Sequence, residues 1–230
     1  MRILITGAAG QIGTNLTRGL KDRHQLRGLD LVPMSELEDT VVGNVADFDT
    51  VFEASKDMDA IIHLANVGPA WDQALQSMVS TYNVLESAAQ NGARRVAYAS
   101  RAGVLPKSHY PRSIQRTMDM LPKPDSYYTV TKVFGENLGF MYSSRHDLEV
   151  VCVRIGNFNK DRDEPTHPHM LSHGDCTHLF EQCLIHPGVK YEVVFGVSDS
   201  DWALYDLDHG RQAIGYYPKD KSIVPEDERK

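Results

Sequence analysis

The hydrophobic pattern alternates between short apolar runs and longer stretches with helical spacing. Apolar, β-branched runs of about four to eight residues are typical of buried strands, and apolar residues three or four positions apart indicate helices. Strands are expected over residues 2–5, 25–30, 41–44, 59–66, 94–100, 149–155 and 191–196. Helices are expected over residues 14–20, 47–54, 71–90, 126–145 and 179–185. This alternation predicts an α/β fold with a doubly wound parallel sheet of the Rossmann type.

Three glycines follow the first expected strand directly. Gly7, Gly10 and Gly13 stand in the stretch TGAAGQIG, where the first helical pattern begins. Glycine lets the backbone turn sharply beside a pyrophosphate, and a helix N-terminus offers N–H groups to that anion. A glycine triplet alone is weak evidence, since turns use glycine in any fold. Its place between a strand and a helix predicts a dinucleotide-binding turn. The expected contacts are Gly7, Ala9, Gly10, Gln11, Ile12 and Gly13.

A carboxylate ends the second expected strand. In a dinucleotide-binding fold, an acid at the place of Asp30 accepts hydrogen bonds from the adenosine ribose and repels a 2′-phosphate. The alternative is an ordinary turn aspartate before Pro33. The upstream glycines favour the first interpretation, and with it NAD over NADP. Further cofactor contacts are expected from Asn44 and Val45 near the adenine and from Leu64, Ala65 and Asn66 at a strand end.

Histidines and two cysteines gather in residues 167–186. Zinc takes such ligands, but their spacing matches no standard ligand set, so no metal site is expected. Cys176 and Cys183 are placed to share one helix face, which favours buried packing thiols. His63 lies inside an apolar run and is interpreted as a packing residue with satisfied hydrogen bonds rather than as a base.

Composition narrows the class of protein. The chain has 230 residues, 24% of them charged, and a net charge of -7, which disfavours nonspecific nucleic-acid binding. No apolar run approaches the ~18 residues of a membrane helix. The chain enters a strand at once, and it has three cysteines, an odd number. These features predict a cytoplasmic protein with reduced thiols, folded as a single domain over residues 1–230.

A tyrosine and a lysine lie one helical turn apart after a proline-rich loop, residues 101–125. Tyr128 and Lys132 therefore share a helix face, in a helix that Ser126 is placed to cap. A nearby ammonium lowers the pKa of a tyrosine, so the pair is suited to move a proton to or from a substrate oxygen. The lysine is also placed to hold the nicotinamide ribose. A tyrosine four residues before a lysine is weak evidence by itself. Downstream of a glycine turn and five expected strands, the pair indicates hydride-transfer chemistry.

These segments together resemble the extended short-chain dehydrogenases/reductases, the NAD-dependent epimerase/dehydratase family, and within it most of all the uronate dehydrogenases. The matching segments include ITGAAGQIG (5–13), IIHLA (61–65), YTVTKVFGENL (128–138), VRIGNF (153–158) and LSHGD (171–175). The resemblance implies a Rossmann fold with a small C-terminal substrate lobe, its substrate side formed by residues 101–125 and 156–217. It also implies NAD as cofactor, with Tyr128, Lys132 and Ile155 beside it, Tyr128 as the general base, and a homodimer formed through the helices of residues 71–90 and 126–145.

The chain departs from this family beside the expected base. Family members carry a second hydroxyl residue where Arg101 follows Ser100, so the candidate catalytic set is Tyr128, Lys132, Ser100 and Arg101. Three interpretations of Arg101 stay open. It stabilises a developing alkoxide, it binds a carboxylate or phosphate of an altered substrate, or it is salt-bridged in an impaired site.

A second departure lies between the RIG and SHxD segments. Uronate dehydrogenases hold the sugar carboxylate with an arginine there, whereas this chain has Thr166 or Pro165 near that position and Arg162 out of register. The expected function is NAD-dependent oxidation or reduction of a hydroxyl or carbonyl of a small sugar, sugar acid or related compound. An NAD-using epimerase or dehydratase would share the cofactor residues. A noncatalytic NAD-binding regulator is the other alternative, because of Arg101.

Overall fold

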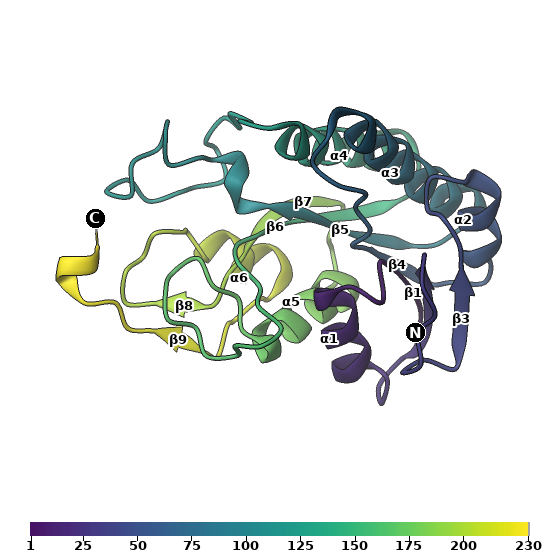
Figure 1. Ribbon diagram of the computed structural model, residues 1–230, viewed down its shortest axis with the longest axis horizontal. Coiled ribbons are helices and arrows are strands. Elements are labelled where there is room, and N and C mark those ends of the chain that lie inside the picture. Colours follow the sequence, from purple (N-terminus) through teal and green to yellow (C-terminus); the bar gives the residue numbers. More distant parts are fainter. Residues whose placement is uncertain (230) are drawn as a thin grey trace.

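One parallel sheet runs through the computed structural model, which describes residues 1–229 (Figure 1). Its seven strands follow the order β3-β2-β1-β4-β5-β6-β7, and every neighbouring pair is parallel. The strands are β1 (Arg2–Thr6), β2 (Gln25–Asp30), β3 (Asp39–Val42), β4 (Ala60–His63), β5 (Arg95–Arg101), β6 (Glu149–Ile155) and β7 (Tyr191–Gly196). The predicted doubly wound sheet is confirmed, with strand boundaries that differ by up to three residues.

Helices cover both faces of this sheet. They are α1 (Gln11–Leu20), α2 (Phe48–Ala54), α3 (Trp71–Asn91), α4 (Tyr127–Arg145), α5 (His173–Ile185) and α6 (Asp208–Ile214). Figure 1 shows α2, α3 and α4 on one face and α1, α5 and α6 on the other. As expected, α3 and α4 pack side by side. None of the helices within residues 1–229 is long and apolar enough to cross a membrane.

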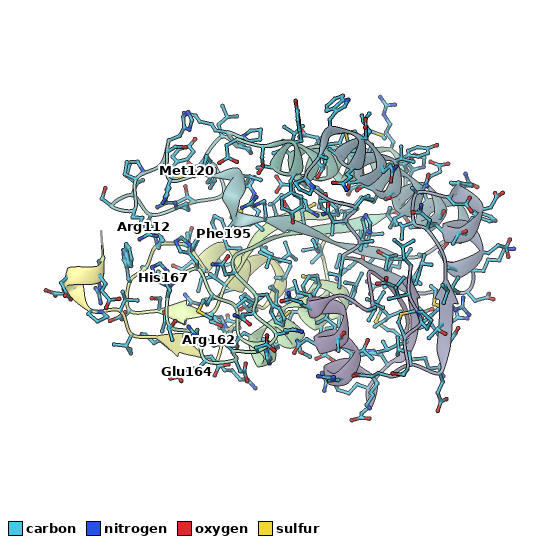
Figure 2. The ribbon with its side chains drawn as sticks, in the orientation of Figure 1. Arg112, Met120, Arg162, Glu164, His167 and Phe195 are labelled. Carbon is cyan, nitrogen blue, oxygen red and sulfur yellow. The ribbon has the colours of Figure 1, made fainter. Side chains whose placement is uncertain are left out.

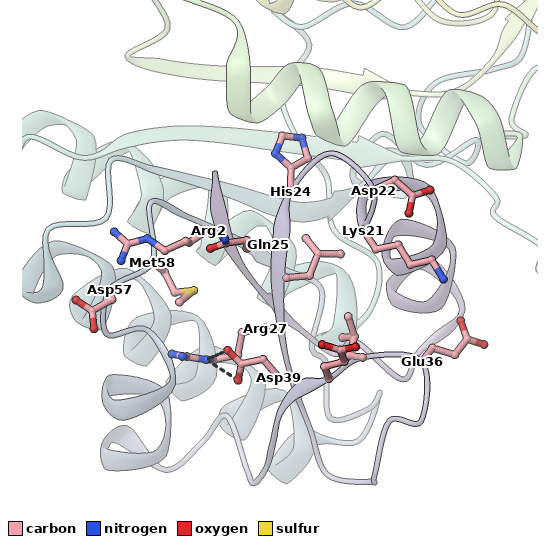
Figure 3. Close-up of a pocket in the computed structure, with 13 residues that line it drawn as sticks. Arg2, Lys21, Asp22, His24, Gln25, Arg27, Glu36, Asp39, Asp57 and Met58 are labelled. Carbon is pink, nitrogen blue, oxygen red and sulfur yellow. Dashed lines mark hydrogen bonds and ion pairs between the residues drawn. The ribbon is translucent and has the colours of Figure 1, made fainter.

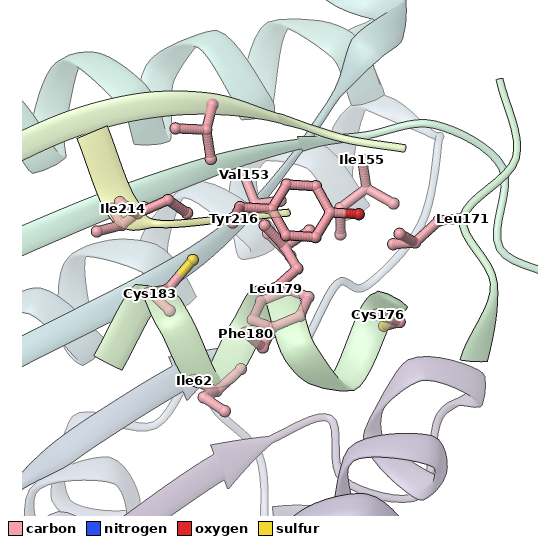
Figure 4. Close-up of a cluster of buried hydrophobic side chains, with 14 of the residues drawn as sticks. Ile62, Val153, Ile155, Leu171, Cys176, Leu179, Phe180, Cys183, Ile214 and Tyr216 are labelled. Carbon is pink, nitrogen blue, oxygen red and sulfur yellow. The ribbon is translucent and has the colours of Figure 1, made fainter. Parts of the chain in front are cut away.

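Alternating side chains of the strands build a core on each face. Ile3 and Ile5 of β1 belong to the cluster beneath α1 and α5, whereas Leu4 belongs to the cluster beneath α2 and α3. Figure 4 shows Cys176 and Cys183 among the apolar side chains of the first cluster. Both thiols are free and buried, and burial raises the pKa of each. The packing interpretation of these cysteines is confirmed.

The segment before α5 changes one predicted boundary. The helix begins at His173, earlier than the expected residue 179, because Ser172 caps it by accepting a hydrogen bond from the N–H of Asp175. Asp175 is buried, and its carboxylate accepts hydrogen bonds from Ser198 and from the N–H groups of Lys219 and Asp220.

Residues 218–229 pack against the C-terminal lobe. A short parallel pair joins β8 (Asp199–Ser200) to β9 (Lys221–Ser222), and a 3₁₀ turn, η2 (Glu226–Glu228), follows. Val224 is buried, and Arg229 forms an ion pair with Asp201 at 2.6 Å. Contacts between residues far apart in sequence hold this tail, so its charge pattern gave no sign of them.

The long loop between η1 (Ala102–Val104) and α4 is organised around a buried arginine. The guanidinium of Arg116 donates hydrogen bonds to the carbonyls of Tyr110, Pro111 and Ile114. Its main chain pairs with the segment around Tyr205, which fixes the loop to the C-terminal lobe. Figure 2 shows Arg112 and Met120 on this loop, above His167 of the lobe.

Candidate active site

The turn between β1 and α1 can be built only with glycine at two positions. Gly7 has a φ of +74°, and a Cβ there would lie 2.8 Å from the Ala65 nitrogen. A Cβ on Gly13 would lie 2.3 Å from the Gly7 carbonyl oxygen. The helix starts after Gly10 with no side-chain cap and no acidic residue in its first turn. Its first N–H groups are therefore left for an anion, and this end of the molecule fits the pyrophosphate of a dinucleotide.

Asp30 lies beside this turn. Its Oδ2 accepts a hydrogen bond from the N–H of Ala9 at 2.9 Å, and its Oδ1 accepts one from the N–H of Leu31. The carboxylate therefore ties the end of β2 to the glycine turn. A cavity of about 290 Å³ opens here, and among the residues that line it are Gly7, Asp30, Asn44, Val45, Leu64, Ala65 and Asn66. The residues expected around adenosine are thus brought together, except that Ala9 lines neither this cavity nor the adjoining cleft.

The main cleft adjoins that cavity and has a volume of about 710 Å³. It is open at the carboxyl ends of β1, β4, β5 and β6, where doubly wound sheets bind ligands. It brings together most of the predicted residues, namely Gly7, Gly10, Gln11, Ile12, Gly13, Leu64, Asn66, Ser100, Arg101, Tyr128, Lys132 and Ile155. Ala99, Gly156, Asn157 and Phe158 complete the lining.

Tyr128 and Lys132 lie together in the first half of α4. The Nζ of Lys132 is 5.3 Å from the ring centre of Tyr128 and 5.2 Å from that of Tyr98. Gly135 makes room for Tyr98, since a Cβ there would lie 2.2 Å from its ring. Burial, together with the cation of Arg101, lowers the pKa of Lys132 to about 8.

The pKa of Tyr128 differs from the sequence-based expectation. Burial raises the pKa of this phenol, and the cation that opposes the rise is Arg101 rather than Lys132. The expectation considered only charge and spacing, and burial decides the direction here. A nearby guanidinium therefore takes part in setting the protonation of the expected base.

The hydroxyl of Ser100 is engaged by Glu136 beneath the cleft, and its part in catalysis stays a prediction. Its Oγ donates to Oε1 of Glu136 at 2.6 Å, and Glu136 is paired with Arg154. All three side chains are buried. Neighbouring residues of a strand point to opposite sides, so the side chains of Ser100 and Arg101 point in different directions although both residues line the cleft. The sequence analysis did not identify Glu136 as part of the site. Its position one helical turn after Lys132 could have indicated that the two side chains lie on the same face of the helix.

Arg101 lies against the expected base. The carbon of its guanidinium is 5.2 Å from the ring centre of Tyr128, and its Nη1 donates to Oγ1 of Thr129 at 3.3 Å. Among residues 1–229, no carboxylate comes within ion-pair distance of this guanidinium. The salt-bridged interpretation of Arg101 therefore fails within the described part of the chain.

His63 is a packing residue, as expected. Its Nδ1 is 2.7 Å from Oγ1 of Thr6, and its Nε2 is 3.3 Å from Oγ1 of Thr81. Burial lowers the pKa of His63 to about 3, so the ring is neutral near pH 7. Across residues 1–229, histidine, cysteine and acidic side chains form no group of three that could hold a metal. Figure 2 shows Arg162 beside Glu164, and Arg162 is exposed and does not line the cleft.

A second large hollow, of about 720 Å³, lies at the amino ends of β1 and β2 (Figure 3). Its lining mixes acids and bases, of which Arg27 and Asp39 form an ion pair at 2.9 Å. Doubly wound sheets bind their ligands at the opposite, carboxyl ends of the strands. This hollow is therefore not the candidate active site.

Comparison with known proteins agrees with this geometry. The family model of the NAD-dependent epimerase/dehydratase family matches residues 3–174. An NAD-dependent glucose-6-phosphate dehydrogenase of Haloferax volcanii is 33% identical over 96% of this chain and 94% of that protein. A uronate dehydrogenase of Pseudomonas putida is 32% identical over 96% of this chain and 85% of that protein.

Solved structures give the same result. The crystal structure of uronate dehydrogenase from Agrobacterium tumefaciens superposes with a TM-score of 0.88 at 31% identity, over 96% of this chain and 85% of that one. A mutant of that enzyme complexed with NAD superposes equally well. The chain therefore belongs to the NAD-dependent epimerase/dehydratase family, as its motifs predict, and it is an NAD-dependent oxidoreductase of the extended short-chain dehydrogenase/reductase type.

Proposed function

We propose that this enzyme oxidises a hydroxyl group of a small sugar or sugar acid, or reduces the corresponding carbonyl, with Tyr128 as the proton-transferring group. The observation that carries the proposal is the meeting of Tyr128 and Lys132 in one cleft with the glycine turn. The relatives named above act on glucose 6-phosphate and on uronates, and a relative from Haloferax volcanii is an L-arabinose 1-dehydrogenase. All of these names point to sugars and their acids.

Different residues of the cleft bind the cofactor and move the proton. Gly7, Gly10 and the start of α1 hold the pyrophosphate, and Asp30 faces the adenosine ribose. When bound, NAD accepts the hydride from the substrate carbon. Tyr128 takes the hydroxyl proton from the substrate oxygen as a general base. Lys132 holds the nicotinamide ribose, and the positive charge of Arg101 favours the phenolate form of Tyr128.

The decisive experiment replaces the phenol alone. Tyr128→Phe is expected to reduce NADH formation by at least a hundredfold, because general-base catalysis is worth roughly 10²–10⁴ in rate. NAD affinity, measured by calorimetry, is expected to stay within about threefold, since the pyrophosphate and adenosine contacts remain. Tyr127→Phe is the matched control, because the neighbouring Tyr127 is exposed and does not line the cleft.

Two other outcomes would redirect the assignment. An epimerase or dehydratase would convert its sugar without net formation of NADH, and Tyr128→Phe would still stop it. A noncatalytic regulator would bind NAD, turn over none of the sugars, and respond to Tyr128→Phe with no change.

We further propose that the enzyme is a cytoplasmic homodimer with one folded domain, whose substrate side is formed by residues 101–125 and 156–217. Three free, buried thiols suit a reducing compartment. On α3, the side chains of Trp71, Leu75, Val79 and Tyr82 are exposed at helical spacing. Tyr127, Val130 and Phe140 of α4 are exposed as well, and the ring centres of Trp71 and Tyr127 are 5.2 Å apart. A second copy of this chain would cover this apolar face.

A further inference from the structure

Arg101, at the end of β5, is a cation that no carboxylate of residues 1–229 pairs with. Its only protein hydrogen bond within residues 1–229 runs from Nη1 to Oγ1 of Thr129, at 3.3 Å. Its Nε and Nη2 have no acceptor in that part of the chain. Arginine forms five donors in a rigid fork and is paired with an acid in most partly buried sites. The Nε and Nη2 side of the guanidinium lies against Gly103, and no acid within residues 1–229 pairs with the group, so its charge is left for an anion that enters the cleft.

The charge of the cleft points to the same conclusion. Lys132 and Arg101 are the two charged side chains that line it, and no aspartate or glutamate is among the lining residues that the structure describes. Arg101 lowers the pKa of Lys132, so the two positive charges lie close enough to repel. Two uncompensated cations in a half-enclosed cleft favour an anionic ligand beyond what the glycine turn binds.

The backbone after β5 leaves room for this side chain. A Cβ on Gly103 would lie 2.5 Å from Nε and 2.6 Å from Nη2 of Arg101. The guanidinium therefore lies in a notch over Gly103, where an added methyl group would push it aside, and the ring of Tyr128 and the hydroxyl of Thr129 also contact it. Thr129 is itself held by Ser126, which caps α4, at 2.8 Å. A long side chain fixed in this way loses little further freedom on binding, which favours selective recognition.

We propose that Arg101 binds the anionic group of the substrate and makes the enzyme selective for sugars that carry a carboxylate or a phosphate. This inference rests on the function proposed above. Carboxylates and phosphates share the paired oxygens that a guanidinium grips with two parallel hydrogen bonds. The oxidation is unchanged: the hydride goes from the substrate carbon to NAD, the hydroxyl proton goes to Tyr128, and the anionic group is only bound.

The alternative, in which Arg101 stabilises the developing alkoxide, makes a different kinetic prediction. An alkoxide contact acts in the transition state of every substrate, so its loss would lower kcat for neutral and anionic sugars alike. Loss of an anion contact would raise KM for the anionic sugars and leave the neutral sugar unaffected.

Three sugars that differ at one carbon provide the test: D-glucose, D-glucuronate and D-glucose 6-phosphate. The wild-type kcat/KM is expected to be at least tenfold higher for one of the two anionic sugars than for D-glucose, since a charge-assisted pair discriminates by roughly this factor or more. Arg101→Gln is expected to reduce that ratio to near one, mainly through KM, and Arg101→Lys to retain part of it. The sugar that depends more on Arg101 identifies carboxylate or phosphate as the bound group.

Two further variants separate position from charge. Gly103→Ala keeps the arginine but places a methyl group where the guanidinium lies, so it is expected to raise KM for the anionic sugar as well. Arg162→Gln removes one positive charge from an exposed loop outside the cleft and is expected to change neither constant. Equal selectivity in the wild type and Arg101→Gln would overturn the proposal, as would a kcat loss shared by all three sugars when each form is compared on the alkaline plateau of its own pH profile.

A binding measurement keeps this inference apart from the proposed function. Tyr128→Phe and the double variant Tyr128→Phe/Arg101→Gln are compared, because neither turns the substrate over. Calorimetry with NAD present gives the affinity of each for D-glucuronate and for D-glucose 6-phosphate. An affinity for one of these sugars that is at least tenfold higher in the protein that keeps Arg101 supports the anion site, and equal affinities refute it. Failure of the wild type to reduce NAD with any sugar would defeat the proposed function alone, because the binding comparison still tests Arg101.

Discussion

Glu136 and Arg154 form a bidentate ion pair directly below the active-site cleft. Nε of Arg154 donates to Oε1 of Glu136 at 3.0 Å and Nη2 donates to Oε2 at 2.9 Å, with side-chain exposures of 5% and 6%. Ser100 donates to the same carboxylate. Glu136 lies one turn after Lys132 on α4, while Arg154 and Ser100 belong to β6 and β5. The pair therefore fixes the helix that carries Tyr128 and Lys132 to the two strands beneath it.

Glu136→Gln is expected to destabilise the fold by about 3 kcal/mol or more, because it leaves the buried Arg154 cation uncompensated. Tm would fall by roughly 10 °C for a chain of this size. Turnover at a temperature where the variant stays folded should also fall, since Lys132 loses its support. Differential scanning calorimetry and NADH absorbance measure the two effects. An unchanged Tm would contradict a structural role for the pair.

Ser100→Ala tests whether that hydroxyl takes part in the chemistry. Because the Ser100 hydroxyl donates to Glu136, turnover should stay within about threefold of the wild type. Stability should fall by about 1 kcal/mol, the value of one buried hydrogen bond to an already paired carboxylate. Steady-state kinetics and urea unfolding give both numbers. A hundredfold loss of kcat with unchanged stability would place Ser100 in the catalytic set.

The sequence predicted those parts of the fold that depend on local patterns. Gly7 and Gly13 were read correctly because the turn needs glycine for reasons of backbone geometry within a few residues. Tyr128 and Lys132 were found because helical spacing alone puts them on one face. The parallel, doubly wound sheet followed from the alternation of strands and helices.

What escaped prediction depends on contacts between distant segments. The partners that hold the Ser100 hydroxyl, Glu136 and through it Arg154, are brought to it by α4 and β6. The raised pKa of Tyr128 comes from burial, which spacing does not reveal. The absence of an acid beside Arg101 within residues 1–229, and the notch at Gly103 that holds its guanidinium, appear only once the cleft is assembled.

Lys132→Met should stabilise the fold while abolishing turnover. The pKa of this buried amine falls from 10.5 to about 8, so its protonated form is held at a cost in the folded state. With about 1.4 kcal/mol for each tenfold change, the variant should gain up to about 3 kcal/mol at pH 7. The unfolded chain binds the proton more tightly, so wild-type stability should rise between about pH 8 and 10.5 and the difference should disappear there. Urea unfolding at pH 7 and pH 10 checks the sign, and lower stability of the variant at pH 7 would refute it.

The pH profile of oxidation should move to higher pH in Arg101→Gln. Arg101 lowers the pKa of both Tyr128 and Lys132, so removing it raises both. The base Tyr128 then loses its proton at higher pH, and the rising limb of kcat/KM shifts upward. The profile is measured with D-glucose, so that loss of an anion contact does not interfere. Arg162→Gln serves as the control, and a profile that coincides with the wild type in both variants would exclude electrostatic coupling.

Val79→Glu should convert the proposed dimer into a monomer. Val79 lies in the middle of the exposed apolar row of α3, between Leu75 and Tyr82, where a second copy would bury it. A glutamate there would bring a charge into a desolvated interface close to its own symmetry mate, which costs several kcal/mol. Light scattering coupled to size-exclusion chromatography gives the mass of each form. Because the residue does not line the cleft and is exposed in the monomer, the variant should still fold and bind NAD.

Val42→Glu, at an exposed valine on the edge strand β3, is the matched control and should leave the mass unchanged. A monomeric wild type, or a dimer that survives Val79→Glu, would rule out this face as the interface.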